Sequence, residues 1–402
     1  MSRDFQLDYK KKELPKKNTT IGFILLAAGL IITIASFAVD VDRASFNTIM
    51  TLMFVTGVGL GSLFLVALEY LVGADWSVPF RRISEILAAT LFIAPVFAIP
   101  LMFNMHGIFE WTHKEIVNND PFLVQKKPYL NEMFFIIRTV GVFALMWLFY
   151  VLIVGRSQKQ DKTKDPKTSR INPKLSAVFM PVFAIVVTVF AIDWMMTLQP
   201  HWYSTIFGVY YFAGSLLAAL ALLTFASVTL NEKGFLSKYI KRDHYYNFGA
   251  LMFAFVNFWA YIAFSQLILI WYANIPEETF WFIDRWNGSW KYVSIGLIVV
   301  KFVVPYALLL SQPSKSDPKR LKFASIWILI AHFYDLYWMI MPTYDKHHHG
   351  GHTTGIQFGW MEIGGPVLAA GILVLAFNMI AKKKNLIPVG DPKLKKGLEF
   401  HL

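Results

Sequence analysis

The sequence predicts an all-α integral membrane protein that crosses the bilayer ten times. Hydrophobic residues make up 56% of the 402 residues, and charged residues make up only 16%. Uncharged runs extend over residues 18–39, 44–68 and 244–276, and about 20 apolar residues are enough to cross a bilayer as a helix. Strands of a membrane barrel would instead alternate apolar and polar residues over about 10 positions, and no segment does so.

The predicted spans are mainly apolar runs between flanking charges. The first two lie in the runs that begin at residues 18 and 44, and the seventh lies in the run that begins at residue 244. The uncharged run over residues 194–231 is too long for one span, and Pro200 divides it because proline removes a helix donor. The turn around Pro200 is expected on the outer side. The ten expected spans are residues 20–38, 48–72, 83–104, 131–154, 175–197, 205–229, 247–273, 290–312, 321–342 and 357–380.

Lysine and arginine are distributed unevenly between alternate loops, and this asymmetry predicts the orientation. One set of loops and tails carries 28 Lys and Arg, whereas the opposite set carries 6. The first set is therefore expected in the cytoplasm. The resulting organisation is a cytoplasmic N-terminal tail over residues 1–19, a single transmembrane domain over 20–381 and a cytoplasmic C-terminal tail over 382–402. The net charge of +12 then reflects membrane insertion and lipid headgroups, and nucleic acid is not an expected partner.

Cysteine and histidine limit the cofactors that this chain can hold. No cysteine is present, which excludes iron-sulfur ligation and disulfides within the chain. Only His332 lies well inside a predicted span, whereas a membrane haem with two histidine ligands needs a matched pair. Four further histidines crowd one outer loop, where they indicate a metal site, a hydrated loop or a partner contact: His347, His348, His349 and His352.

Several ionisable residues fall within or near the ends of the predicted spans. A charge in lipid costs from a few to more than ~10 kcal/mol, so these groups are expected to face protein, a partner or water. At about 1.5 Å per helical residue, five of them lie roughly 6 to 16 Å below the outer surface and are expected to form one cluster: Asp193, Arg138, Asp335, His332 and Lys301. Glu69 and Glu85 lie near the inner surface, close to Arg81 and Arg82.

Two interpretations of these buried charges stay open. Carboxylates and imidazole exchange protons, and nearby cations tune them, so all seven residues are candidates for a proton path. Alternatively, Asp335 or Asp193 neutralises Arg138 and Lys301 in permanent ion pairs that fix helix packing. Glu69 and Glu85 also have the option of extending to water, because they lie near span ends.

Four groups of residues carry a resemblance to a known family. They are LEY at 68–70 with WSVPFRR at 76–82, HGIFEWTH at 106–113 with KPYLN at 127–131 and Arg138, WYANIPEE at 271–278, and HFYDLYW at 332–338. Together they resemble the ActF family, the second NrfD/PsrC-like membrane subunit of bacterial alternative complex III. The similarity extends over essentially the whole chain in order, and WYANIPEE is its strongest single string.

The resemblance implies a fold, a function and a location. The fold would be ten transmembrane helices arranged as two four-helix bundles plus two extra helices. The chain would be a non-redox membrane subunit of a (mena)quinol:cytochrome c oxidoreductase, with a scaffolding role and a candidate role in proton translocation, and it would not be catalytic alone. It would lie in the bacterial inner membrane as a multi-pass protein with both termini in the cytoplasm.

The resemblance also implies partners and cofactors. The partners are an iron-sulfur protein, multihaem and monohaem cytochromes c and an NrfD-like quinol-binding subunit, with a terminal oxidase as a further candidate and lipids around the spans. Those subunits would carry the c-type haems and iron-sulfur clusters. This chain would hold no cofactor of its own, and menaquinone stays a candidate ligand. The alternative function is a secondary transporter with a buried charged substrate or proton site, because ten spans and buried charges are ordinary there too.

Overall fold

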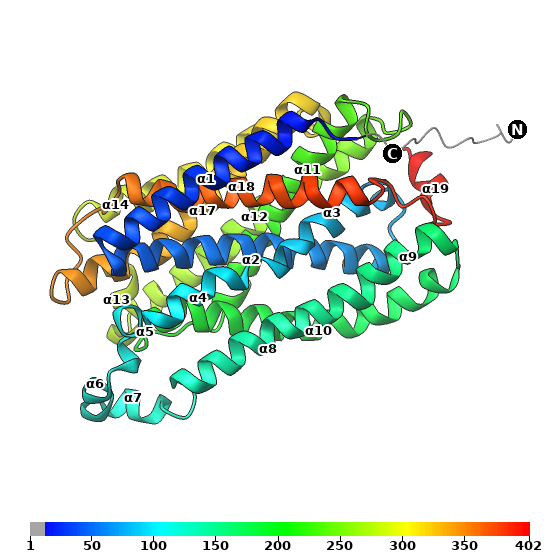
Figure 1. Ribbon diagram of the computed structural model, residues 1–402. Coiled ribbons are helices and arrows are strands. Elements are labelled where there is room, and N and C mark those ends of the chain that lie inside the picture. The colour runs from blue at the N-terminus through cyan, green and yellow to red at the C-terminus, as the bar shows by residue number, and fades with distance from the viewer. Residues whose placement is uncertain (1–12) are drawn as a thin grey trace, which may run out of the picture.

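The computed structural model describes residues 13–402, and helices make up 81% of the structure. Ten helical stretches are long and apolar enough to cross a membrane, and residues 13–402 contain no strand. The stretches lie side by side along one axis (Figure 1). They are α1 Lys16–Val39, α2 Val41–Val72, the third span Val78–Phe103 with α3 Arg81–Ala88 and α4 Pro95–Phe103, the fourth span Glu132–Thr163 with α8 Glu132–Tyr150 and α9 Arg156–Thr163, α10 Lys167–Trp194, α11 Phe207–Glu232, α12 Arg242–Ala273, the eighth span Trp290–Leu309 with α14 Trp290–Ile298 and α15 Val304–Leu309, α17 Pro318–His348 and α18 Trp360–Lys383. The predicted all-helical class is confirmed, and so is the presence of ten helical stretches of membrane-spanning length and composition.

Short helices lie at the two ends of the bundle. We call the end with the C-terminal segment the basic end, on the right in Figure 1, and the other the far end. The far end carries α5 Met105–Ile108, α6 Lys114–Asn119, α7 Pro121–Lys126 and α13 Pro276–Asp284, and the basic end carries α16 Gln312–Ser316 and α19 Leu394–Leu398. By the distribution of lysine and arginine, the basic end is the predicted cytoplasmic one.

Capping residues at the helix ends follow from the sequence. Asp40, Asn131 and Asp317 begin α2, α8 and α17, and each side chain accepts a hydrogen bond from a backbone N–H three residues ahead. Such caps satisfy donors that have no partner within the helix. Gly73 ends α2 with a φ of 67°, a left-handed conformation that glycine adopts without strain.

Two prolines lie near predicted span ends and behave differently. At Pro200 the chain turns as predicted, since α10 ends at Trp194, a 3₁₀ turn ends at Leu198 and α11 begins at Phe207. The ninth span was expected to end at residue 342, but α17 continues through Pro342 to His348. A proline removes the donor for the carbonyl four residues earlier. Arg285 supplies the replacement, because its guanidinium donates to the carbonyls of Trp338 and Met339 at 3.1 and 2.6 Å.

Helices α2 and α11 lie at the centre of the bundle. Helix α2 contacts α1, α3, α10, α11, α17 and α18, and α11 also contacts α10, α12 and α17. Gly57 and Gly61 let α2 approach α11 closely, because a Cβ atom at Gly61 would lie 2.7 Å from the Cβ of Ala219. The core along these two helices is therefore tightly packed, and it positions the polar groups described below.

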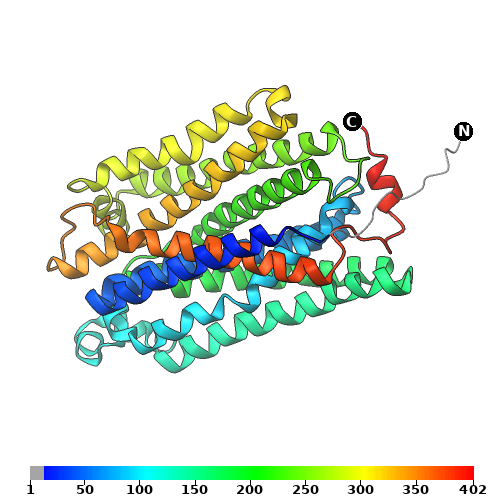
Figure 2. The ribbon, with the colours of Figure 1, turned by 45° about the horizontal axis from the view of Figure 1, so that its top comes forward.

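Helices α1 and α18 form a peripheral pair that crosses the face of the bundle in Figure 2. Glycines hold the two backbones close together. A Cβ atom at Gly29 would lie 2.5 Å from the backbone of Leu368, and one at Gly371 would lie 2.4 Å from the backbone nitrogen of Leu26. The outward side of α1 is apolar and exposed, as expected for a surface that contacts lipid.

Replacing Gly29 with alanine is expected to destabilise the protein by about 1–3 kcal/mol, because the added methyl group forces α1 away from α18. Gly141 on α8 is a matched control, since a Cβ atom there would meet nothing within 4 Å. Gly141→Ala should instead stabilise its helix by roughly 0.5–1 kcal/mol. Thermal unfolding in detergent measures both changes, and equal shifts for the two variants would contradict the close packing.

The segment predicted as a C-terminal tail folds back onto the basic end. Its side chains Leu386, Ile387, Leu394 and Leu398 are buried. His244 at the start of α12 contacts the carbonyl of Gly397 at 2.8 Å. The segment is therefore part of the folded bundle. Most of the predicted N-terminal tail, residues 1–12, lies outside the described residues.

Candidate functional site

Lys301, Asp335, His332 and Tyr210 meet in the interior of the bundle, and we call them the Lys301 cluster. The ammonium of Lys301 forms an ion pair with Asp335 and lies 3.2 Å from Nδ1 of His332. The Tyr210 hydroxyl donates to the other Asp335 oxygen at 2.6 Å. Lys301, His332 and Asp335 are each only 1% exposed. Three spans thus bring four proton-exchanging groups into direct contact.

The backbone around Lys301 departs from the regular α-helix. Residues Val299–Val303 form a π-helical turn, a feature often found at functional sites. Pro305 follows it and has no N–H to offer. The indole of Trp327 donates to the carbonyl of Val300 at 2.7 Å, so a side chain supports this turn. Gly214 leaves room for the cluster, because a Cβ atom there would lie 3.1 Å from both Lys301 Nζ and His332 Cε1.

The two ring nitrogens of His332 have different surroundings. An ammonium group can only donate, so Nδ1 accepts from Lys301 and the proton of the neutral ring resides on Nε2. Nε2 is buried without a hydrogen-bond partner. Nδ1 is therefore the ring nitrogen that faces the proton donor Lys301, and Nε2 is the nitrogen that carries the proton of the neutral ring.

Arg138 and Asp193 form a second, separate group at the far end. The guanidinium donates to both carboxylate oxygens, at 2.8 and 3.0 Å. Tyr129 donates its hydroxyl to Asp193 at 2.9 Å and accepts from Arg138 through its carbonyl. This two-pronged geometry is typical of a fixed ion pair.

The sequence predicted that these residues form one outer cluster, and this prediction is wrong, because they form two separate groups. Within residues 13–402, no hydrogen bond or ion pair joins Arg138 and Asp193 to the Lys301 cluster. Counting residues from the span ends gives depth, but it does not give the direction in which a helix face points. The pairings that the structural interpretation required, Arg138 with Asp193 and Lys301 with Asp335, are both present.

A network of ion pairs occupies the basic end. Arg81 contacts Glu69 at 2.8 Å and Glu85 at 3.7 Å, and Arg82 also contacts Glu85. Two carboxylates that the sequence did not single out complete this basic-end network, namely Asp161 on Arg82 and Asp391 on Arg81. Four carboxylates thus surround two guanidinium groups.

Glu69 and Glu85 lie near Arg81 and Arg82, as predicted. They are 7% and 0% exposed, so the alternative in which they extend to water is wrong. The C-terminal segment, through Asp391, covers this part of the bundle. The carboxylates are consequently held by protein groups and not by solvent.

Histidines at the far end pair singly with carboxylates. His347 contacts Glu110 at 3.2 Å, and His349 contacts Asp345 at 3.0 Å. His201 contacts Asp120 at 2.5 Å. Among residues 13–402, no group of three His, Cys, Asp or Glu side chains is placed to hold a metal ion.

The contact with His347 lowers the pKa of Glu110 from its ordinary value, against the opposing effect of burial. A carboxylate with a lowered pKa in the folded state adds stability at neutral pH, and this stability is lost as the pH falls below about 4.5. The contribution is expected to be about 0.5 kcal/mol or less, because both side chains contact water.

Glu110→Gln should therefore flatten the loss of thermal stability between pH 5 and 3, measured as the unfolding temperature across that range. Glu132→Gln removes an exposed carboxylate at the same end and serves as the control. If the unfolding temperatures of the wild type and of Glu110→Gln change with pH in the same way, the Glu110–His347 pair does not contribute to stability as expected.

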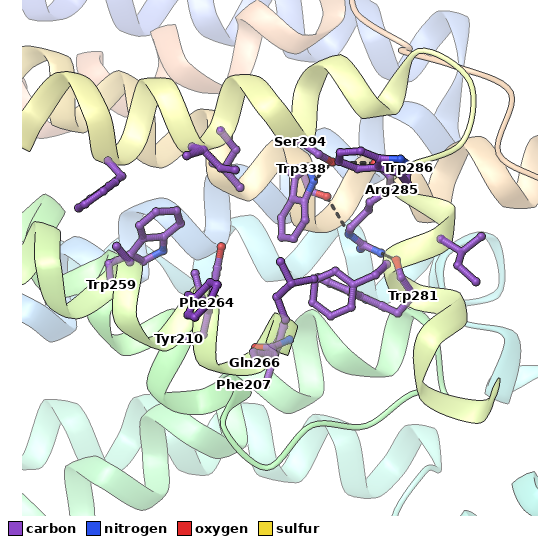
Figure 3. A pocket seen from close by; sticks show the side chains of 18 residues that line it. Phe207, Tyr210, Trp259, Phe264, Gln266, Trp281, Arg285, Trp286, Ser294 and Trp338 are labelled. Carbon is purple, nitrogen blue, oxygen red and sulfur yellow. Dashed lines mark hydrogen bonds between the residues drawn. The ribbon is translucent and has the colours of Figure 1, made fainter. Parts of the chain in front are cut away.

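Arg285 lies beside an aromatic cavity of about 640 Å³ between α11, α12, α13, the eighth span and α17 (Figure 3). Its guanidinium rests 3.3 Å from the centroid of the Trp281 ring and donates to three carbonyl oxygens. Burial lowers the pKa of Arg285 to about 9, so the group keeps its charge at neutral pH. Arg285 is one of the six lysines and arginines in the less basic set of loops, and it lies between α13 and α14.

Comparisons with known proteins give no relative. No family model matches the chain, and no curated protein matches it. The geometry of the Lys301 cluster and of the basic-end network is therefore the basis for a functional proposal, together with the resemblance of the four groups of residues.

Proposed function

We propose that this chain is a cofactor-free membrane subunit of a (mena)quinol:cytochrome c oxidoreductase of the alternative complex III type, in which it scaffolds the complex and relays protons. The observation that carries the relay is the contact of Lys301 with both Asp335 and His332 in the interior of the bundle. The assignment to this complex is supported by the four groups of resembling residues.

The relay follows from the chemistry of the cluster. When a proton binds to Asp335, Lys301 loses its negative partner while it stays buried. An unpaired charge in such a site is unfavourable, so Lys301 passes its proton to Nδ1 of His332. The imidazolium then releases its Nε2 proton to a water molecule, and Asp335 passes its proton to Lys301, which restores the ion pair. Tyr210 holds Asp335 in place through its hydrogen bond.

The basic-end network provides a second group of proton-binding carboxylates. Helix α2 carries Glu69 in this network, and it packs beside α11, which carries Tyr210. Buried hydroxyl groups without hydrogen-bond partners lie along the same two helices at Thr56, Ser62 and Ser227. Ordered water commonly bridges such groups. We propose that water on these hydroxyls connects the Lys301 cluster with the network.

The packing of the spans also supports the resemblance. Helices α2, α3–α4, α8 and α10 contact one another, as do α11, α12, α14–α15 and α17, while α1 pairs with α18. This grouping suits two four-helix bundles plus two extra helices. The predicted location is the bacterial inner membrane, with the basic end in the cytoplasm.

Purification of the chain from native membranes in a mild detergent tests the assignment. The preparation should contain partners with c-type haems, detected by absorbance, and iron-sulfur clusters, detected by electron paramagnetic resonance. Recovery of a stable, solitary chain without either cofactor would contradict it. Substrate-driven uptake by proteoliposomes that contain this chain alone would favour a secondary transporter instead.

A further inference from the structure

The aromatic cavity beside Arg285 opens sideways from the bundle. Its lining comes mainly from aromatic and aliphatic side chains of α12, α13 and the eighth span. Phe264, Trp286 and Ile298 line it and are themselves exposed, at 62%, 59% and 56%. In a membrane this side of the spans contacts acyl chains. A molecule that enters the cavity therefore comes from the lipid phase and not from water.

Among the described residues, Arg285 differs from the other buried and half-buried arginines and from the buried Lys301. Each of these others contacts a carboxylate within 4 Å: Arg43, Arg81, Arg82, Arg138 and Lys301. Arg285 contacts none in the part of the chain that the structure describes. The neighbouring carboxylate of Asp284 is engaged by Lys346 at 2.8 Å and Gln199 at 3.3 Å.

The guanidinium of Arg285 also retains hydrogen-bonding capacity. It has five N–H groups, and three of them donate to the carbonyls of Trp281, Trp338 and Met339. Two N–H groups remain, and the side chain is only 1% exposed. A buried cation with spare donors at the edge of a cavity is suited to an anionic oxygen.

Gln266 provides a second polar group in the same cavity (Figure 3). Its side chain is 4% exposed, and its amide oxygen has no hydrogen-bond partner. Leaving such a group unpaired costs about 1–3 kcal/mol. The amide can rotate to present either its oxygen or its NH₂ group, so it can bind a head group that Arg285 also binds.

We infer that this cavity binds an acyl lipid whose head carries a carboxylate or phosphate oxygen. The head accepts hydrogen bonds from Arg285 and Gln266. The acyl chain lies against Phe264, Ile298 and Phe302. The positive charge selects an anionic head, and the apolar lining with its lateral opening selects a chain. The inference does not rest on the proposed proton relay, although the two sites adjoin: Tyr210 of the Lys301 cluster is a wall residue of the cavity, and the ring centroid of the wall residue Trp259 lies 4.8 Å from the Lys301 ammonium.

Photoaffinity labelling of the full chain in nanodiscs tests the site. The probe is stearate that carries a diazirine, compared with its methyl ester, and labelled peptides are mapped by mass spectrometry. Saturable labelling is expected within 259–267 and 281–298. The methyl ester should label these segments ~10-fold less, since it forfeits the charge-assisted bonds to Arg285. Competition by unlabelled stearate, phosphatidylglycerol or inorganic phosphate identifies whether the head is a carboxylate, a lipid phosphate or a free ion.

Two matched variants keep the result interpretable. Ala263→Trp fills the cavity and should reduce labelling ~10-fold, because the cavity volume is lost. Ala370→Trp makes the same change in a different lipid-facing cavity and should leave labelling intact. Equal labelling of wild type and Ala263→Trp would overturn the inference, as would equal labelling by the ester or displacement by inorganic phosphate alone.

Discussion

Asp335→Asn is expected to abolish most proton translocation while the complex still assembles. The amide retains the shape of the carboxylate. Its oxygen can still accept the hydrogen bond from the Tyr210 hydroxyl, which in the wild-type chain donates to Asp335 at 2.6 Å. It can neither bind the incoming proton nor balance the charge of Lys301. Loss of one positioned proton-transfer group typically slows proton transfer by ~10²- to 10⁴-fold. The proton yield per quinol should therefore fall to the yield from quinol chemistry alone.

Proteoliposomes that contain the whole complex provide the measurement. Quinol and cytochrome c start turnover, and a trapped dye reports the internal pH. Asp193→Asn is the matched control, because it changes a two-pronged ion pair outside the Lys301 cluster; it should lower thermal stability and leave the proton yield intact. Tyr210→Phe preserves the ion pair and should slow translocation even if Asp335→Asn fails to assemble. An unchanged proton yield in Asp335→Asn and Tyr210→Phe would refute the relay.

The sequence predicts the number of membrane-length helices correctly, because that number depends on the length and composition of each apolar run. It cannot predict which charges meet. Asp193 and Asp335 both lie in the outer half of their predicted spans, yet they belong to different groups. Which partner each aspartate meets depends on the direction in which its face of α10 or α17 points. That direction is set by packing across the bundle.

Residues that complete the sites were missed for identifiable reasons. Asp391 lies 310 positions from Arg81, and its place depends on how the C-terminal segment folds back. Tyr210 is one aromatic residue among many near span ends, so nothing in its local pattern marks it. Arg285 was counted as a loop charge. The one available signal for it was Pro342, whose missing N–H leaves a carbonyl that needs an outside donor.

Arg81→Met is the change expected to cost the most stability. It keeps most of the apolar stem of the side chain but removes the charge that faces Glu69, Glu85 and Asp391. Removing one partner from a buried ion pair typically costs about 3–5 kcal/mol, because the remaining charge is left without compensation. Lys322→Met is the control, since its pair with Glu232 is half exposed and should contribute about 1 kcal/mol or less.

Thermal unfolding in detergent, followed by circular dichroism, measures both losses. Adding Glu69→Gln to Arg81→Met should recover part of the stability, because it removes one of the uncompensated carboxylates. Such recovery would show that the lost stability comes from the uncompensated charge and not from altered packing, since the double variant packs no better than the single one. If Arg81→Met costs no more than Lys322→Met, water reaches the network and its carboxylates are solvated. The basic-end network would then be an aqueous entrance to the bundle and not a sealed group of ion pairs.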